Sequence, residues 1–275
     1  MILNLVLSVD TGKGSNLLPF NYQYPLSAAI YNIIKKGDTQ YNYFLHHTGY
    51  GANRLKLFTF SDIIIRFICK GDRMLLQGKN ALLKVCFHID EAAGYFVKGL
   101  FMEERLVIGD QKSQVHFRIQ EVENYLPLLP VNTINNMVNV VLEPISPMVV
   151  GSPNPNTSIT RFYSPYEKIF IERLLLGWIK KYKVVSGLND KDIESIKSRI
   201  TIEVQFYDSP PWEKTITIKD GLPSSHKIRG YIKFRLKITA PKAMVELALN
   251  SGLGLKNSMG MGCVQLIQNN EHRKC

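Results

Sequence analysis

Residues 2–36 read ILNLVLSVDTGKGSNLLPFNYQYPLSAAIYNIIKK, which predicts a strand, a loop and then a helix. The run Ile2–Ser8 has the composition of a strand. In Pro25–Lys36 the apolar residues recur every three or four positions, the spacing of an amphipathic helix. Two lysines followed by Gly37 indicate where this helix ends, and Asp38 can cap a second short helix that stops at Gly49.

Strand-like segments follow these helices. Each is a short run rich in apolar and β-branched residues, bounded by turn residues. They are Leu55–Phe60, Ile63–Cys69, Leu82–Ile89 and Gln114–Gln120. A strand, a helix and then several strands is the order of an α+β domain.

The same order repeats in the second half of the chain. The segment Tyr125–Asn132 is rich in Leu and Pro and separates the two halves. A strand at Met137–Leu142 then precedes a long helix, whose start is indicated by the capping box of Ser164 and Glu167. We therefore predict two related α+β domains in tandem, residues 1–128 and residues 129–275.

Composition places the chain among ordinary globular proteins. It has 275 residues, of which 45% are hydrophobic and 10% aromatic, and this excludes a disordered or collagen-like chain. It contains no uncharged apolar run long enough to span a membrane, and its start lacks the features of a signal peptide. We expect a cytoplasmic protein. The four cysteines form no CxxC pair, so neither a zinc ribbon nor a disulfide framework is indicated.

Positive charge is concentrated in the second half. The formal net charge is +11, and residues 1–160 carry 14 Lys and Arg against 12 Asp and Glu, whereas residues 161–275 carry 20 against 11. Such an excess favours a polyanionic partner, nucleic acid before an anionic membrane surface. A lysine excess that only improves solubility is the alternative explanation.

The segment His226–Thr239 is the most informative of the predicted strands. Its even-numbered positions are mainly apolar, and because side chains alternate along a strand, its odd-numbered positions share the other face. That face would carry Lys227, Arg229, Tyr231, Lys233, Arg235 and Lys237. Cations on a sheet can follow a phosphate backbone and a tyrosine can stack on a base, so we expect single-stranded or hairpin RNA to bind here. An ordinary solvated sheet face is the alternative.

A glycine-rich loop follows a short helix that begins after Pro241. It lacks the Gly-Lys-Ser/Thr of a P-loop, and it leads from a helix into a strand, the reverse of a dinucleotide-binding turn. Its glycines permit positive φ and a close approach of backbone N–H groups to phosphate, and its polar residues add donors. The alternative is a purely structural loop. The candidate RNA-binding residues here are Gly252, Gly254, Lys256, Asn257, Ser258, Gly260 and Gly262.

These residues carry a family resemblance. Two Gly-x-Gly pairs, Gly252–Gly254 and Gly260–Gly262, separated by five residues and leading into a last strand, resemble the C-terminal signature of CRISPR-associated endoribonucleases that process precursor crRNA, within the RAMP superfamily. The first half agrees in order and spacing with that family's motifs through YPLSAAIY (24–31), FLHHTGY (44–50) and KLFTFS (56–61). The resemblance implies two tandem ferredoxin-like, or RRM-like, domains.

The resemblance also implies a reaction and its residues. Such enzymes cleave without a metal or other cofactor: a 2′-hydroxyl attacks its own 3′-phosphate and leaves a 2′,3′-cyclic phosphate and a 5′-hydroxyl. His46 matches the catalytic histidine, and the end of a short helix favours its protonated form. Adjacent His47 is the competing candidate, and Tyr31 would position the 2′-hydroxyl. The family's usual lysine is missing, so Arg54 and Lys56 are the cations that could stabilise the transition state or bind phosphate.

The partners follow from the same resemblance. We expect the protein to bind CRISPR repeat RNA in precursor crRNA, with other subunits of a CRISPR effector complex as further candidate partners. We expect no membrane partner, and a monomer or a homodimer. The alternative function is a non-cleaving subunit that holds repeat RNA, and a third is a general binder of single strands or membrane surfaces.

Overall fold

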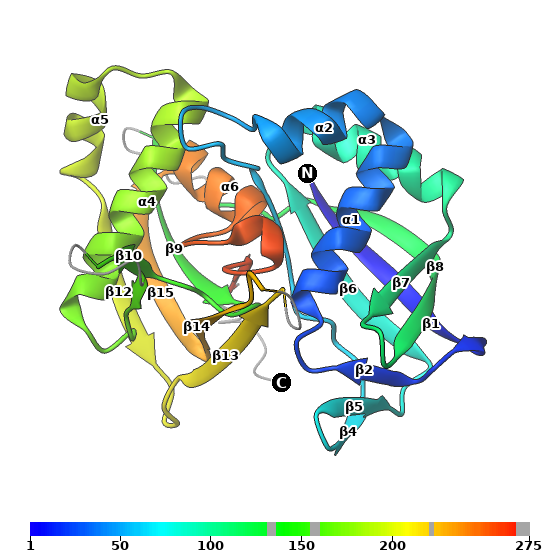
Figure 1. Ribbon diagram of the computed structural model, residues 1–275. Helices are drawn as coiled ribbons and strands as arrows, with labels where there is room; N and C mark the ends of the chain where they lie inside the picture. Colours follow the sequence, from blue (N-terminus) through cyan, green and yellow to red (C-terminus); the bar gives the residue numbers. More distant parts are fainter. Residues whose placement is uncertain (131–135, 155–159, 220–222, 268–275) are drawn as a thin grey trace, which may run out of the picture.

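The computed structural model describes residues 1–130, 136–154, 160–219 and 223–267. Figure 1 shows two halves side by side, the first coloured blue to green and the second green to red. In each half, helices cover one face of an antiparallel sheet. Both halves contain the chain order strand, helix, two strands, helix and strand within their main sheets, and the repeated sequence pattern predicts such a repeat.

The first half has a five-stranded sheet in the order β3-β6-β1-β8-β7. The central strand β1 is antiparallel to both β6 and β8, and β3 is antiparallel to β6. Without the edge strand β7, this is the βαββαβ order of a ferredoxin-like domain. The elements are β1 (Ile2–Gly14), α1 (Gln23–Gly37), α2 (Thr39–His47), β3 (Phe58–Phe60), β6 (Asn80–Phe87), α3 (Asp90–Met102), β7 (Arg105–Gly109) and β8 (Gln114–Tyr125).

The second half repeats this topology in a four-stranded sheet ordered β12-β15-β9-β16. Helices α4 and α6 contribute to its core. Its elements are β9 (Met137–Pro144), β10 (Gly151–Pro153), β11 (Thr160–Phe162), α4 (Lys168–Ser186), α5 (Asp190–Lys197), β12 (Thr201–Phe206), β13 (Trp212–Ile218), β14 (His226–Ile232), β15 (Phe234–Pro241), α6 (Lys242–Ser251), the 3₁₀ turn η2 (Asn257–Met259) and β16 (Val264–Leu266).

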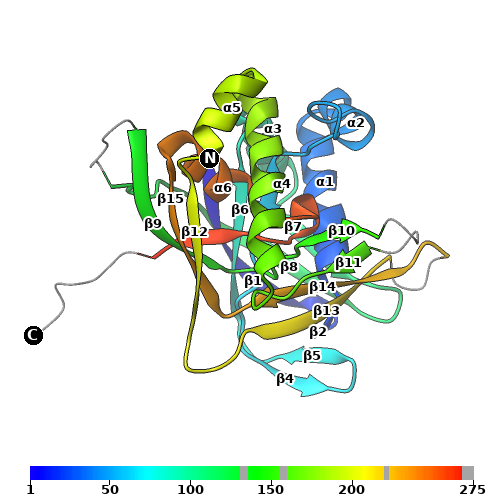
Figure 2. The ribbon, with the colours of Figure 1, turned by 90° about the vertical axis from the view of Figure 1, so that its left-hand side faces the viewer.

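Both halves carry an inserted hairpin between the second and third strands of the ferredoxin-like order. In the first half it is β4 (Phe67–Lys70) with β5 (Arg73–Leu76), and β5 also pairs with β2 (Leu17–Pro19). In the second half it is β13 with β14. Figure 2 shows the two hairpins at the same end of the molecule. The predicted domain bounds at residues 128 and 129 stay a prediction, since the sheets themselves use residues up to 125 and from 137.

The predicted helix starts and stops agree with local hydrogen bonds. The Tyr41 backbone N–H donates to the Asp38 side chain at 2.6 Å, so Asp38 caps α2 as expected. Glu167 accepts a hydrogen bond from the Ser164 backbone N–H at 2.7 Å, which is one half of the expected capping box, while the helix itself begins at Lys168. Helix α3 was not expected from the sequence, which suggested only strands in this part of the chain.

The predicted strand His226–Thr239 is wrong as a single strand. Lys233 lies in the left-handed region with φ of 62° and separates β14 from β15. The two strands belong to different sheets, because β14 pairs with β13 whereas β15 pairs with β12 and β9. The predicted apolar face is correct, but Ile228 packs in a small cluster beneath the hairpin and Phe234 packs in the main core of the second half.

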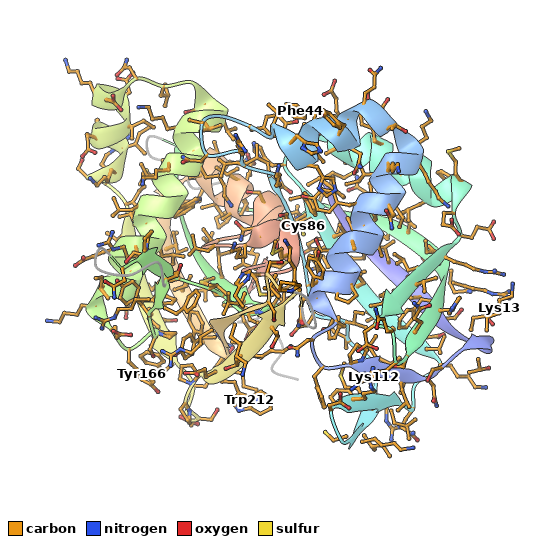
Figure 3. All side chains as sticks on the ribbon, viewed as in Figure 1. Lys13, Phe44, Cys86, Lys112, Tyr166 and Trp212 are labelled. Atoms are coloured by element: carbon orange, nitrogen blue, oxygen red, sulfur yellow. The ribbon has the colours of Figure 1, made fainter. Side chains whose placement is uncertain are left out.

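The two halves share a packed hydrophobic core as well as polar contacts. Ile2, Leu57 and Cys86 of the first half pack with the core of the second. Cys86 lies at the junction in Figure 3, and its Sγ atom is 3.9 Å from Sγ of Cys263. Backbone contact also crosses the junction, since the Asp62 N–H donates to the Ile145 carbonyl at 3.0 Å. Among the residues that the structure describes, no helix is long and apolar enough to cross a membrane.

Helices α1 and α3 approach each other through two glycines. A Cβ atom on Gly99 would overlap the Ile33 carbonyl oxygen, and one on Gly37 would overlap the Tyr95 carbonyl oxygen. Each helix therefore has a glycine where the backbone of the other passes. By contrast, Gly94 on the same helix α3 is exposed and has nothing within 4 Å of such a Cβ.

We predict opposite effects of alanine at these two positions of α3. Gly99→Ala should lower the free energy of unfolding by at least about 1–3 kcal/mol, because the backbones must separate. Gly94→Ala should raise it by about 0.5–1 kcal/mol through helix propensity alone. Chemical denaturation of both variants checks this, and equal effects of the two substitutions would contradict the packing described.

Candidate active site

A cleft of about 590 Å³ lies between the two halves. Its walls come from the segment before β3, from α4 and from the glycine-rich loop. Among the described residues that line it, none is acidic and six are basic. The basic residues are Arg54, Lys56, Arg173, Lys180, Lys181 and Lys256. Such a surface is suited to a polyanion, because cations without acidic neighbours leave the cleft strongly positive.

Aromatic rings connect two predicted catalytic residues. His46, near the end of α2, packs on Tyr31 of α1 with ring centroids 4.1 Å apart. Tyr31 in turn meets the ring of Phe58 in β3 edge to face, at 5.3 Å. Since Phe58 also lines the cleft, this stack places His46 and Tyr31 beside it. His47 instead packs on the exposed ring of Tyr43, at 4.3 Å.

Lys56 is the cation nearest to His46. Its Nζ donates a hydrogen bond to the His46 carbonyl oxygen at 3.2 Å, and its side chain is half-buried. Burial lowers the pKa of Lys56, and the charge of Arg54 lowers it further. Arg54 itself is exposed. The structure therefore places Lys56, rather than Arg54, against the predicted catalytic histidine.

The pKa of His46 shifts in the direction opposite to that expected from its place at a helix end. Burial is the main cause of the lowered pKa, and the positive charges of Lys56 and His47 add to it. The helix dipole, which would favour the protonated form, is weak at an exposed terminus. His46 is therefore mostly neutral at neutral pH, so its imidazole can accept a proton.

Burial likewise raises the pKa of the Tyr31 hydroxyl, although a hydrogen bond with the Ser258 side chain opposes the shift. That bond connects the first-half helix α1 to the glycine-rich loop. A second one runs parallel to it, from the Ser27 hydroxyl to the Ser258 carbonyl oxygen at 2.7 Å. The loop is thus held against the same helix that carries Tyr31.

The glycine-rich loop has the positive φ angles that its sequence predicts, at all four glycines of the two Gly-x-Gly pairs. The reason lies within the protein. A Cβ on Gly260 would strike the ring of Phe60 in β3, and one on Gly262 would overlap the Leu253 carbonyl oxygen. The glycines allow the loop to fold on itself and to seat on the first half.

The side chain of half-buried Asn257, which also lines the cleft, makes its hydrogen bonds within this loop and to α4. Its Nδ2 donates to the carbonyl oxygens of Leu253 and Met261, both at 2.9 Å, and its Oδ1 accepts from Lys181 Nζ at 2.9 Å. All three bonds brace the loop, and RNA contact by the Asn257 side chain stays a prediction. Lys256, by contrast, is exposed and lines the cleft.

The predicted cationic strand does not form one surface. Tyr231 is only 6% exposed, and its hydroxyl donates to Glu213 at 2.7 Å, so the expected base-stacking tyrosine is wrong. Acids also mix in on the neighbouring strands: Arg229 lies 3.7 Å from Glu213, and Lys237 pairs in register with Glu203. None of the six residues lines the cleft.

Two more cations of this set, Lys233 and Arg235, have protein partners as well. Lys233 Nζ lies 3.5 Å from the centre of the Trp212 ring. Arg235 donates from Nε to the Tyr207 hydroxyl at 2.8 Å, and that hydroxyl donates to Glu143. RNA contact by the exposed Lys227, Arg229, Lys233 and Lys237 stays a prediction.

Three cationic residues of the cleft were missed in the sequence. Arg173, Lys180 and Lys181 all belong to α4. Arg173, Gly177 and Lys180 are spaced four and three residues apart, so they lie on one face of the helix. The two basic residues on that face could have indicated a cationic surface.

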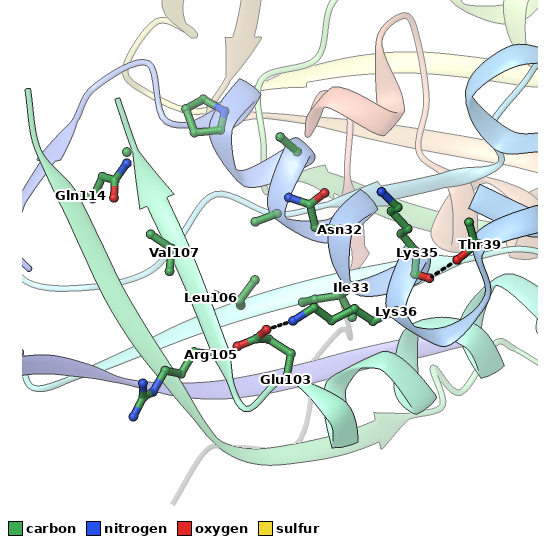
Figure 4. Close-up of a pocket in the computed structure, with 14 residues that line it drawn as sticks. Asn32, Ile33, Lys35, Lys36, Thr39, Glu103, Arg105, Leu106, Val107 and Gln114 are labelled. Atoms are coloured by element: carbon green, nitrogen blue, oxygen red, sulfur yellow. Dashed lines mark hydrogen bonds and ion pairs between the residues drawn. The ribbon is translucent and has the colours of Figure 1, made fainter. Parts of the chain in front are cut away.

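A second concave surface, of about 720 Å³, lies between α1 and the edge strand β7. Figure 4 shows that Lys36 is paired there with Glu103, and that Thr39 donates to the Lys35 carbonyl oxygen. None of the predicted catalytic residues lines it. Lys56 and Arg54 line the cleft between the halves, whereas His46 and Tyr31 line neither concave surface and lie beside that cleft through Phe58.

Two family models match the chain, one for each half. The model for CRISPR-associated protein Cas6, N-terminal, matches residues 17–123, and that for CRISPR associated protein Cas6, C-terminal, matches residues 130–266. The chain belongs to the Cas6 family. This confirms the family resemblance in the glycine-rich loop and in the three first-half motifs.

Curated relatives and solved structures agree with this membership. CRISPR-associated endoribonuclease Cas6 1 of Methanocaldococcus jannaschii is 25% identical over 277 residues, covering 99% of this chain and 95% of the relative. CRISPR-associated endoribonuclease Cas6 of Pyrococcus furiosus is 26% identical over 251 residues, covering 90% and 83%. A Cas6-related protein structure from Pyrococcus furiosus has a TM-score of 0.75 at 20% identity, covering 98% of this chain and 99% of its own. The likeness confirms the tandem ferredoxin-like fold.

The contact between Lys56 and His46 makes a prediction about titration. Replacing Lys56 by Met removes a positive charge beside the imidazole, so protonation becomes easier and the pKa of His46 should rise. Arg54→Met removes the same charge from an exposed residue, where solvent screens it, and should change the pKa of His46 less. NMR titration of the histidine ring checks both variants, and equal shifts would contradict the assigned contact.

Proposed function

We propose that this Cas6 protein is an endoribonuclease that cleaves CRISPR repeat RNA in precursor crRNA. The carrying observation is that His46, Tyr31 and Lys56 lie together beside a cleft lined by six cations and no acids among the described residues. The names of the two curated relatives, both CRISPR-associated endoribonucleases, support the proposal.

The proposed reaction is an internal transesterification. The 2′-oxygen loses its proton and bonds to phosphorus, the bond to the 5′-oxygen breaks, and the 5′-oxygen gains a proton. Products are a 2′,3′-cyclic phosphate and a 5′-hydroxyl, with no net change in protons or electrons. The proposed chemistry uses no metal ion and no cofactor.

Each of the three residues has a role that its surroundings suit. His46 is mostly neutral at neutral pH, so it can accept the proton of the 2′-hydroxyl and, once charged, donate one to the leaving oxygen. The raised pKa of Tyr31 keeps its phenol protonated, as a donor that orients the 2′-hydroxyl. Lys56 supplies the positive charge near the phosphorane, in place of the lysine missing after Tyr50.

Binding is assigned to the cleft and its margins. The exposed Lys256, with Arg173 and Lys180 of α4, would contact the phosphate backbone on the side of the second half. The glycines of the loop shape this wall and need not touch RNA through side chains. Such contacts make affinity depend steeply on salt concentration.

The reaction can be tested with end-labelled CRISPR repeat RNA in the presence of EDTA. We expect cleavage at one position, products with a cyclic phosphate, and no cleavage when the nucleotide before the cut carries a 2′-deoxy substitution. Cleavage of the deoxy RNA, or cleavage only after a divalent metal ion is added, would overturn the proposed chemistry.

A matched pair of variants tests the catalytic histidine. His46→Ala should lower the single-turnover rate by about 10²–10⁴, the usual size of a proton-transfer contribution, with little change in RNA affinity. His47→Ala should cut at nearly the parent rate, because its ring packs on Tyr43 and not on Tyr31. A loss confined to His47→Ala would reassign the catalytic role.

If the parent protein binds repeat RNA and never cuts it, the alternative of a non-cleaving RNA-binding subunit holds.

A further inference from the structure

Lys181 is a buried cation that the proposed chemistry does not use. It lies on α4 and is only 6% exposed, whereas its neighbour Lys180 is exposed. A lysine is almost never fully buried unless its charge has partners, because removing an ammonium ion from water is costly. The hydrogen-bond partners of Lys181 therefore indicate its role.

All the hydrogen-bond partners of Lys181 belong to the junction of α6 with the glycine-rich loop. Its Nζ donates to the carbonyl oxygens of Ser251 at 3.1 Å and Gly252 at 2.7 Å, and to the side-chain oxygen of Asn257 at 2.9 Å. An ammonium group has three donors and no acceptor, so these three oxygens use its full capacity.

Asn257 links Lys181 by hydrogen bonds to both ends of the glycine-rich loop. Because its Oδ1 accepts from Lys181, its amide nitrogen points the other way and bonds the carbonyl oxygens of Leu253 and Met261. One buried side chain of α4 thus fixes the end of α6, the start of the loop and the 3₁₀ turn that carries Lys256 and Ser258.

The charge of Lys181 is unbalanced within the described part of the protein. It forms no ion pair with a carboxylate there, and its acceptors are all neutral oxygens. It also lines the cationic cleft, directly beneath the loop. A neutral donor could satisfy some of the same oxygens at lower cost, so an ionisable lysine at this position is explained best by an anion that binds above it.

We propose that Lys181 is a positioning residue that holds the glycine-rich loop in its RNA-binding shape and completes its charge balance when an RNA phosphate occupies the cleft. The inference rests on the proposed function, in that it takes RNA as the anion. It assigns to Lys181 no contact with the reacting atoms. Its effect on RNA acts through Asn257, Lys256 and the loop backbone.

The charged groups around Lys181 determine how RNA affinity should depend on pH. Burial lowers its pKa to about 7. The charge of Lys181 acts across the junction on His88, which also interacts with the Met1 amino group and with Asp90, and Lys256 lies in the loop above. The Asp90 carboxylate acts on His88 and Met1, whereas burial alone shifts the pKa of Lys181, so no described carboxylate stabilises the charged ammonium. A phosphate in the cleft does so, and RNA binding should therefore take up a proton near pH 7.

The test compares Lys181→Met with Lys183→Met, its matched control. Lys183 is an exposed lysine of the same helix, paired with Asp190 outside the cleft. The probes are repeat RNA blocked by a 2′-deoxy nucleotide and a single-stranded RNA of unrelated sequence. Dissociation constants are measured from pH 6 to 8.5, and circular dichroism and thermal unfolding show whether each variant is folded.

We expect Lys181→Met to weaken binding of the blocked RNA about tenfold to a hundredfold at pH 6.5, as for lost hydrogen bonds to a charged group. The parent and Lys183→Met should lose affinity as pH rises through 7, up to about tenfold per pH unit, and Lys181→Met should lose this dependence. A folded Lys181→Met with parental affinity and parental pH dependence would overturn the proposal.

A second variant keeps the test decisive if Lys181→Met does not fold. Asn257→Ala removes the side chain that joins Lys181 to the loop and leaves Lys181 with its two carbonyl partners. It should weaken RNA binding without removing the pH dependence. Unchanged affinity would contradict the proposal that Lys181 acts on the loop through Asn257. Failure of the proposed nuclease function shows separately, since binding is measured on RNA that cannot be cut and on unrelated RNA.

Discussion

The seating of the glycine-rich loop on strand β3 is the constraint on which the rest of the site depends. Gly260 lies against the ring of Phe60, where any side chain would collide with it. Beside this contact, the Thr59 hydroxyl donates to the Met261 carbonyl oxygen at 3.2 Å. Both partners are buried, so water does not compete for this bond. The loop of the second half is therefore fixed to the first half by backbone and by packing.

Neither half forms the site without the other. The aromatic stack and Lys56 come from the first half, whereas α4 and Lys256 come from the second. Because the halves share a hydrophobic core, the distance between the two sets does not depend on a hinge. The proposed reaction acts on a flexible RNA strand, so the protein must orient the strand. A rigid arrangement of the proposed proton-transfer residue His46 and the cationic cleft would provide that orientation.

Much of the fold could be predicted because local sequence patterns indicate the repeated order of strands and helices. Helix α1 has a regular apolar face, α2 has its Asp38 cap, and the loop has its glycines. Helix α3 could not be predicted in this way, since its two glycines and its aromatic residues give it weak intrinsic helix propensity. Its stability comes from packing against α1, and no local pattern reports such contacts.

The site was only partly predictable for a similar reason. His46, Tyr31 and Lys56 lie in short motifs, and the structure brings all three together. The break at Lys233 follows no turn signal in the sequence, and its lysine stacks on Trp212, which is distant in the chain. Lys181 appears as one more polar residue on an amphipathic helix, and only the fold shows that it lies beneath the loop.

A crystal structure with 2′-deoxy-blocked repeat RNA tests most directly whether the two halves share one active site. We expect the scissile phosphate at the junction, within hydrogen-bond reach of His46 or Lys56, about 2.6–3.2 Å, with the adjoining backbone along Lys256 and α4. A scissile phosphate bound elsewhere, such as between α1 and β7, with the cleft free of RNA, would contradict it.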